Sequence, residues 1–427
     1  MYKPLISPND AVCESSSDSQ AIQNAVDLAV QSGVRRVVIP RVNARTGQAE
    51  WRVDRAVLLP SNIEIVLDNC LIRQEDGSMD NVFRNANVYT ALGTSSEGEQ
   101  ENIVIRGVGT AVIDGGTPNG LTESTSLREG RPHIIWNNTI LLHNVRNFVL
   151  ENFTIRNQRW WAINLIFARD GRLSNLTFQA MDNIPNQDGI DLRVGCHDIL
   201  IENVFGQGGD DLIALSGFAG FEVTPQFGVA DRDRDIYNVI VRNVVGTSVT
   251  KAIVALRNHD GIGLRNVHIS GVYDTSGDER GNMPYAAVRI GQKWFYKKRM
   301  STLGETRGIY VSDVHAAHGV GVMVNVTLEQ SRFDGIYCEK SAQQAITTRT
   351  DTQQEEQRGA KIVNTVFENI FGNRESASSK PLVEFCRGTG EDGLENVLVR
   401  NVFTSGNVCP VRSDFDSGLH LEGIFGG

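Results

Sequence analysis

The chain has 427 residues, of which 40% are hydrophobic and 22% charged, and its formal net charge is −10. This acidic balance argues against a general nucleic-acid-binding protein, because phosphate recognition needs a basic surface. No apolar run is long enough for a secretory leader or a membrane span, so we expect a cytoplasmic protein without a membrane partner, unless a leader was removed.

The first predicted element is a helix over residues 17–32. Apolar residues recur there at three- and four-residue spacing, behind a Ser/Asp cap, which is typical of an amphipathic helix. We expect it to cover the N-terminal end of the fold, within a cap region over residues 15–40. The six cysteines are scattered without paired spacing, which predicts mostly buried free thiols rather than a disulfide framework or a zinc site.

A repeated phrase dominates the rest of the chain. Each copy has two short, β-branched, alternating runs separated by a polar corner, which is typical of two strands meeting at a bend. The corner residue of the phrase falls at Asn152, Asn175, Asn203, Asn243, Asn266, Asp313, Asn369 and Asn401. Gaps of 23 to 32 residues fit one coil of a solenoid, and gaps of 47 to 56 residues fit two.

These coils predict an all-β fold, a single-stranded right-handed parallel β-helix. Stacked coils place equivalent residues about 4.8 Å apart, so that apolar residues form interior ladders and corner residues can bond to their neighbours. The coils lack the helical half of a leucine-rich repeat and the four-strand blade of a propeller. We expect residues 1–427 to form a single domain, with coils over roughly residues 50–410.

Two adjacent coils are rich in carboxylates. Asp188 lies in the first, and Asp210 and Asp211 lie in the second; Asp188 and Asp210 are 22 residues apart, about one coil. Carboxylates packed together raise the pKa of at least one of them, because like charges resist joint ionisation. A protonated acid beside an ionised base is what glycoside hydrolysis requires.

The alternative for these acids is structural. An Asp at a β-helix corner can cap a turn or bind calcium through its oxygens. For the set of three we favour catalysis and expect no metal, whereas Asp191 is assigned a structural role because its odd offset from Asp188 turns it to the other face of a regular strand. Asp210 and Asp211 can share a cleft only at a bend.

Residues 15–405 resemble glycoside hydrolase family 28, the polygalacturonases and their relatives. The resemblance is carried by Val112–Gly115, Arg131-Pro132, Asn157–Trp161, Asn186–Asp191, Gly209–Ala214 and Arg289-Ile290. It implies a general acid at Asp210, with Asp188 and Asp211 activating water for inversion of the anomeric centre, and no cofactor. It also implies that Arg289 holds a carboxylate or ring oxygen of the substrate.

The sequence departs from the family at two motifs. Its Gly-His-Gly turn falls on Thr250-Lys251-Ala252, so that Lys251 takes the place of the histidine. Its Arg-Ile-Lys motif appears as Arg289-Ile-Gly291, with Lys293 as a replacement cation. Since both groups serve a galacturonate in the family, we expect a different sugar at the cleavage subsite. Asn186 and Trp161 are further candidates for substrate binding, the latter by stacking on a sugar ring.

The leading hypothesis is therefore an inverting glycosidase of a pectin-like or other plant-derived oligosaccharide or polysaccharide, exo-acting on imported fragments. Two alternatives stay open. A β-helix polysaccharide lyase or epimerase would use a base and a cation, for which Lys251 and Arg289 are candidates. A glycan-binding protein without activity would use the acids only as caps. Nothing in the sequence indicates an oligomer.

Overall fold

The computed structural model describes residues 5–121, 134–181, 184, 186–218, 227–277, 284–291, 299–339, 342–349, 360–373, 380–388, 392–405 and 408–426. The chain divides into two compact units. The first comprises residues 1–191, 198–200 and 226–233, and the second comprises residues 192–197, 201–225 and 234–427. Each unit is described by itself.

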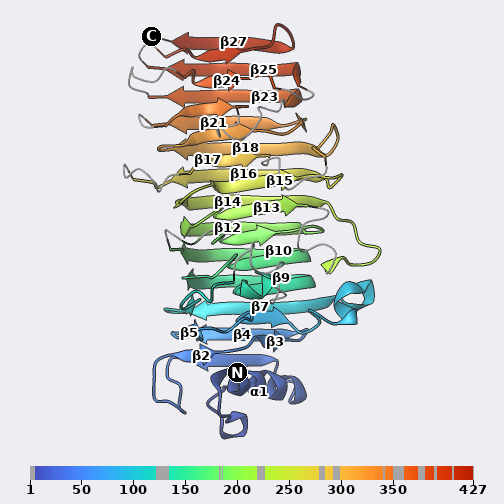
Figure 1. The fold of residues 1–427 in the computed structure, drawn as a ribbon, viewed down its shortest axis with the longest axis vertical. Helices are drawn as coiled ribbons and strands as arrows, with labels where there is room; N and C mark the ends of the chain where they lie inside the picture. Colours follow the sequence, from blue (N-terminus) through green and yellow to red (C-terminus); the bar gives the residue numbers. More distant parts are fainter. Residues whose placement is uncertain are drawn as a thin grey trace. The chain divides into compact units, whose positions relative to one another are not determined.

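The first unit begins with one α-helix and continues with parallel strands (Figure 1). Its elements are α1 (Asp18–Gln31), β1 (Arg36–Pro40), β2 (Trp51–Val53), β3 (Val57–Leu59), β4 (Ile63–Asp68), β5 (Leu71–Gln74), β6 (Phe83–Asn85), β7 (Gln100–Val108), β8 (Val112–Asp114), β9 (Ile140–Arg156) and β10 (Ile163–Gln179). Short 3-10 helices lie at Ala11–Cys13, Ala91–Thr94, Ser96–Gly98 and Ile134–Asn137. The chain passes to the second unit within β11 (Ile190–Leu192) and β12 (His197–Gly208).

Helix α1 forms because its apolar stripe finds a core to cover. The Ser17 side chain accepts a hydrogen bond from the backbone N–H of Gln20 at 3.3 Å, which satisfies a free donor of the first turn. Ile22, Ala25, Val26 and Ala29 are fully buried. The predicted N-terminal helix is thereby confirmed.

Strand β9 shows how one coil is built. Its first residues pair in parallel with β6, its middle residues with β7 and its last residues with β8. The direction changes occur at Asn144, Asn147 and Asn152, all of which have positive φ. A single continuous strand therefore turns through three faces of the coil, and β10 repeats its course directly above it, with fourteen paired positions.

The second unit consists of further coils of the same kind. Its strands are β13 (Ile213–Gly217), β14 (Ile236–Ser248), β15 (Ala252–Asn258), β16 (Leu264–Asp274), β17 (Ala286–Ile290), β18 (Thr306–Ala316), β19 (Val320–Val324), β20 (Leu328–Glu329), β21 (Arg332–Cys338), β22 (Gln344–Thr347), β23 (Lys361–Gly372), β24 (Val383–Phe385), β25 (Gly393–Thr404), β26 (Val411–Ser413) and β27 (Leu419–Gly426).

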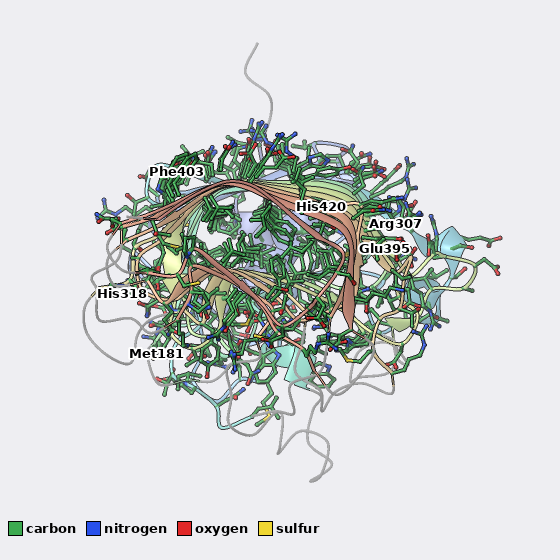
Figure 2. All side chains as sticks on the ribbon, turned by 90° about the horizontal axis from the view of Figure 1, so that it is seen from above. Met181, Arg307, His318, Glu395, Phe403 and His420 are labelled. Atoms are coloured by element: carbon green, nitrogen blue, oxygen red, sulfur yellow. The ribbon has the colours of Figure 1, made fainter. Side chains whose placement is uncertain are left out.

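Two parallel ladders run through these strands. One joins β14, β16, β18, β21, β23, β25 and β27, and the other joins β13, β15, β17, β19, β22, β24 and β26. Apolar side chains fill the interior of the coil, whereas Phe403, Arg307 and Glu395 lie on its outer surface (Figure 2). The all-β, right-handed parallel β-helix with an N-terminal helix is confirmed; a single domain stays a prediction.

Asparagine occupies the corners because it tolerates the left-handed conformation and bonds to the next coil. Asn243 has a φ of 55° and donates its side-chain amide to the Asn203 side chain at 2.6 Å. The same bond recurs from Asn266 to Asn238 at 2.6 Å. These two bonds belong to different corners, because Asn243 aligns with Gly271, and Asn266 with Gly308.

This alignment corrects one interpretation of the repeat. The spacing predicted a single series through Asn243, Asn266 and Asp313, with two coils in the 47-residue gap after Asn266. Strand β16 pairs directly with β18, so the two strands are one coil apart. Each coil has two corners that favour the same residue type, and counting along the sequence mixed them.

Replacing Asn243 with Ala should lower the free energy of unfolding by about 1–2 kcal/mol, because alanine is strained in the left-handed conformation and the bond to Asn203 is lost. Urea denaturation followed by circular dichroism measures the change. Asn243→Gly is the control, since glycine adopts positive φ without strain. An equal loss in both variants would show that the hydrogen bond, and not the backbone conformation, carries the effect.

The state of the cysteines agrees with the prediction of mostly buried free thiols. Five of the six cysteines are buried and free, and Cys409 is exposed and free.

In the described part of the chain, no helix is long and apolar enough to cross a membrane.

Candidate active site

Asp188 lies in the first unit, directly before β11, and is 2% exposed. The preceding coil holds the backbone around it. The backbone N–H of Ala162 donates to the Asp188 carbonyl at 2.9 Å, and the side chains of Gln158 and Gln187 each donate to the other segment. Asn186 begins this segment with a φ of 61°. Two glutamines and a left-handed asparagine thus fix the course of the chain into Asp188.

The tryptophan pair of the same unit is mostly internal. Trp161 is 7% and Trp160 is 2% exposed, and their ring centroids lie 5.6 Å apart. The Asn138 side chain donates to the Trp161 carbonyl at 3.2 Å, which fixes the backbone. Little of Trp161 is open to a sugar, and its role in substrate binding stays a prediction. Asp191 is fully buried within β11.

Asp210 and Asp211 lie in the second unit, where the chain bends between β12 and β13. Gly209 and Asp210 form the bend, so the condition under which neighbouring aspartates can share a cleft is met. The Ser248 hydroxyl donates to the Asp210 carbonyl, and the Thr250 hydroxyl donates to the Gly209 carbonyl at 3.1 Å. The end of β14 and the turn after it therefore hold this bend in place.

The Asp211 carboxylate is buried and paired. It is 2% exposed, and it accepts hydrogen bonds from the backbone N–H of Ala252 at 3.0 Å and from the Arg257 guanidinium, also at 3.0 Å. Both contacts hold the carboxylate oxygens in a site that water hardly reaches. No motif in the sequence marks Arg257. Arg257 can be found only from the alignment of the coils, because it pairs with Ser216, one coil earlier in the same ladder.

The surroundings of the Asp210 carboxyl group raise its pKa. Burial, and then the negative charge of Asp211, raise the pKa of Asp210 from 3.8 to about 6, although Lys251, Arg257 and Arg289 act in the other direction. Below about pH 6 most of this group therefore carries a proton. Asp210 is thus better suited than an ordinary aspartate to donate a proton, as a general acid must.

The cationic side chains predicted for the site differ in their contacts within the second unit. The backbone N–H of Lys251 donates to the Ser248 hydroxyl at 2.8 Å, and its ammonium lies 5.7 Å from the centre of the Tyr285 ring. Arg289 lies on β17, opposite Ala255 and Met323, and is 7% exposed. Both act electrostatically on Asp210. Lys293, like Arg131 and Pro132, lies outside the described residues.

Comparison with known proteins agrees with these motifs. Residues 76–226, which include Asp188, Asp210 and Asp211, match the family model of glycosyl hydrolases family 28. No curated protein sequence matches the chain.

Solved structures share the fold at low sequence identity. A family 28 exopolygalacturonase from Yersinia enterocolitica is 13% identical, with a TM-score of 0.52 over 99% of this chain and 78% of that one. An endo-xylogalacturonan hydrolase from Aspergillus tubingensis is 13% identical, with a TM-score of 0.54 over 98% and 95%. A mannuronan C-5 epimerase A-module from Azotobacter vinelandii is 16% identical, with a TM-score of 0.57 over 97% and 99%.

These structural similarities show the parallel β-helix, and the family model identifies the segment that carries the acidic motifs. The resemblance predicted from the sequence is thus confirmed over residues 76–226, the segment that matches the model of glycosyl hydrolases family 28.

Proposed function

We propose that the chain is an inverting glycoside hydrolase that acts on a pectin-like or other plant-derived oligosaccharide or polysaccharide. The observation that carries the proposal is the contrast between two neighbouring carboxyl groups. Asp211 is buried and bound by an arginine, whereas the pKa of Asp210 is raised to about 6. The family match over residues 76–226 supports a glycosidase.

In this mechanism Asp210 protonates the oxygen of the leaving sugar, and ionised Asp211 accepts a proton from the attacking water. Asp188 would share the second task, since it lies 22 residues before Asp210, about one coil. Water then attacks the face of the sugar opposite the leaving group, and the anomeric configuration inverts. Arg289 and Lys251 supply positive charge for an acidic group of the substrate, and Asn186 and Trp161 are further proposed contacts.

Exo-action on oligosaccharide fragments is part of the proposal. Lys251 and Gly291 depart from the family motifs that serve a galacturonate. These departures favour a different sugar at the cleavage subsite.

The pH dependence of turnover follows from Asp210. Its raised pKa means that the group is protonated below about pH 6 and ionised above it. Since a general acid acts only while protonated, kcat/KM should fall about tenfold for each pH unit above that value. A pH series of initial rates measures the alkaline limb. A flat profile between pH 5 and 8 would contradict the assignment of Asp210 as the acid.

Product analysis tests the reaction class. Wild-type protein and Asp210→Asn are incubated with a panel of pectic and other plant oligosaccharides, and the products are followed by proton NMR from the first minutes. A sugar released with inverted configuration by the wild type alone is the expected result. Retention would contradict the mechanism, and an unsaturated product would identify a lyase. A changed uronate without cleavage would identify an epimerase, and no turnover across the panel would favour a glycan-binding protein.

A further inference from the structure

Lys251 is held at both ends beside the proposed acid. The backbone N–H of Lys251 donates to the fully buried Ser248 hydroxyl at 2.8 Å, and this hydroxyl donates to the Asp210 carbonyl. The Ser248 side chain therefore links the segment of Lys251 to that of Asp210. At the other end, the ammonium lies over the Tyr285 ring, 5.7 Å from its centre. The Tyr285 N–H in turn donates to the Lys251 carbonyl at 2.6 Å. Asp210, Lys251 and Tyr285 thus follow one another from coil to coil.

The charge of Lys251 is not neutralised by a carboxylate. In the part of the chain that the structure describes, its ammonium makes no ion pair, and the aromatic ring is its contact. Arg257 differs, because its guanidinium pairs with Asp211 at 3.0 Å. An aromatic face attracts a cation within about 6 Å through its quadrupole and leaves the full positive charge in place. A carboxylate in the position of Tyr285 would have cancelled that charge.

We propose that Tyr285 is a positioning residue that holds the Lys251 ammonium beside Asp210, so that this charge sets the pH range in which Asp210 can donate a proton. The inference rests on the proposed function for its catalytic meaning, and on the contacts of Ser248 and Tyr285 for its physical basis. It assigns a role to Tyr285, which lies outside the sequence motifs that the family resemblance uses.

The direction of the effect follows from the charges around Asp210. Asp211, from the same bend, favours the protonated form of Asp210, whereas Lys251 and Arg257 from the two ends of β15, and Arg289 from β17, favour the ionised form. Removing one of the cations therefore raises the pKa of Asp210. Without the ring, the flexible four-carbon stem of Lys251 lets the ammonium move into solvent, where water and salt screen it.

The test is a direct titration of Asp210, which needs no substrate. Protein labelled with carbon-13 at the aspartate carboxyl groups is titrated by NMR, and the Asp210 signal is assigned by its loss in Asp210→Asn. Lys251→Met should raise the pKa of Asp210 by about one unit, the scale expected for a neighbouring charge. Tyr285→Leu should raise it in the same direction by less. Tyr285→Phe keeps the ring and should leave it unchanged.

Control variants distinguish the shift in the Asp210 titration from the effects of losing any lysine charge or of partial unfolding. Lys361→Met removes a lysine charge on β23 and should not move the Asp210 titration. Thermal melts establish that each variant is folded, and Tyr285→Met replaces Tyr285→Leu if the latter does not fold. An unchanged Asp210 titration in Lys251→Met overturns the proposal. So does a wild-type titration in Tyr285→Leu or Tyr285→Met alongside a shift in Lys251→Met.

The control of Asp210 by Lys251 and Tyr285 and the glycosidase assignment can be contradicted separately. If the protein is a glycosidase, the alkaline limb of kcat/KM should move to higher pH in Lys251→Met and Tyr285→Leu by the same amounts as the titration. If the titration moves as expected and no glycan is turned over, the control of Asp210 by Lys251 and Tyr285 stands, and the glycosidase assignment fails.

Discussion

Replacing Asp210 with Asn is expected to lower glycan turnover by about 10²- to 10⁴-fold, the range that a positioned general acid contributes. The amide has nearly the same shape as the carboxyl group but no proton to give at the pH of the reaction. KM should change much less than kcat, because the change affects proton transfer in the transition state. Initial rates on the substrate identified by product analysis, measured below pH 6, give both quantities.

Asp198→Asn is the matched control for this change. Asp198 has a φ of 55° and is exposed at a corner where other coils have asparagine, so the new residue fits the backbone. Its turnover should equal that of the wild type. Comparable losses in the two variants would show that turnover is insensitive to the acid, and would contradict the role of Asp210.

Replacing Arg257 with Met should have the second largest effect, on both stability and turnover. The Asp211 side chain is 2% and the Arg257 side chain 14% exposed, and they lie 3.0 Å apart. Removing the arginine leaves a buried carboxylate with one charged partner fewer, which costs about 3 kcal/mol or more. We expect that loss in urea denaturation, with turnover lower by about 10²-fold because the ionised base is no longer held.

Arg387→Met provides the comparison, because it breaks an ion pair that is exposed on both sides. Arg387 lies 3.4 Å from Asp416, and their side chains are 55% and 99% exposed. The loss should be below about 1 kcal/mol, as for other exposed pairs. If Arg257→Met were as mild as Arg387→Met, with normal turnover, Arg257 would not be the group that holds Asp211.

Much of the fold follows from local pattern. The alternating runs predicted the coils because each strand places one side chain inside and the next outside, whatever the rest of the chain does. The helix Asp18–Gln31 was predictable because its apolar residues recur at three- and four-residue spacing, which places them on one face. Asp188, Asp210 and Asp211 stood out because carboxylates are unusual at such density in adjacent coils.

The partners of the acids could not be predicted, because they depend on register between coils. Arg257 meets Asp211, and Ser248 meets Asp210, across segments of 46 and 38 residues. The spacing of the repeat did not define those lengths, since coils of different size carry the same corner residue. Tyr285 was missed for a related reason: no motif marks it, and only the stacking of the coils brings its ring to Lys251.

The corner asparagines have a consequence for how such a chain can diversify. The bond from Asn175 to Asn152 closes a coil of 23 residues, and the bond from Asn243 to Asn203 closes one of 40. The same corner geometry thus accommodates a difference of 17 residues (40 − 23) in coil length. Evolution can therefore lengthen or exchange the segments between corners, one coil at a time, without disturbing the coils above and below. Substrate preference and scaffold can change at separate rates in this architecture.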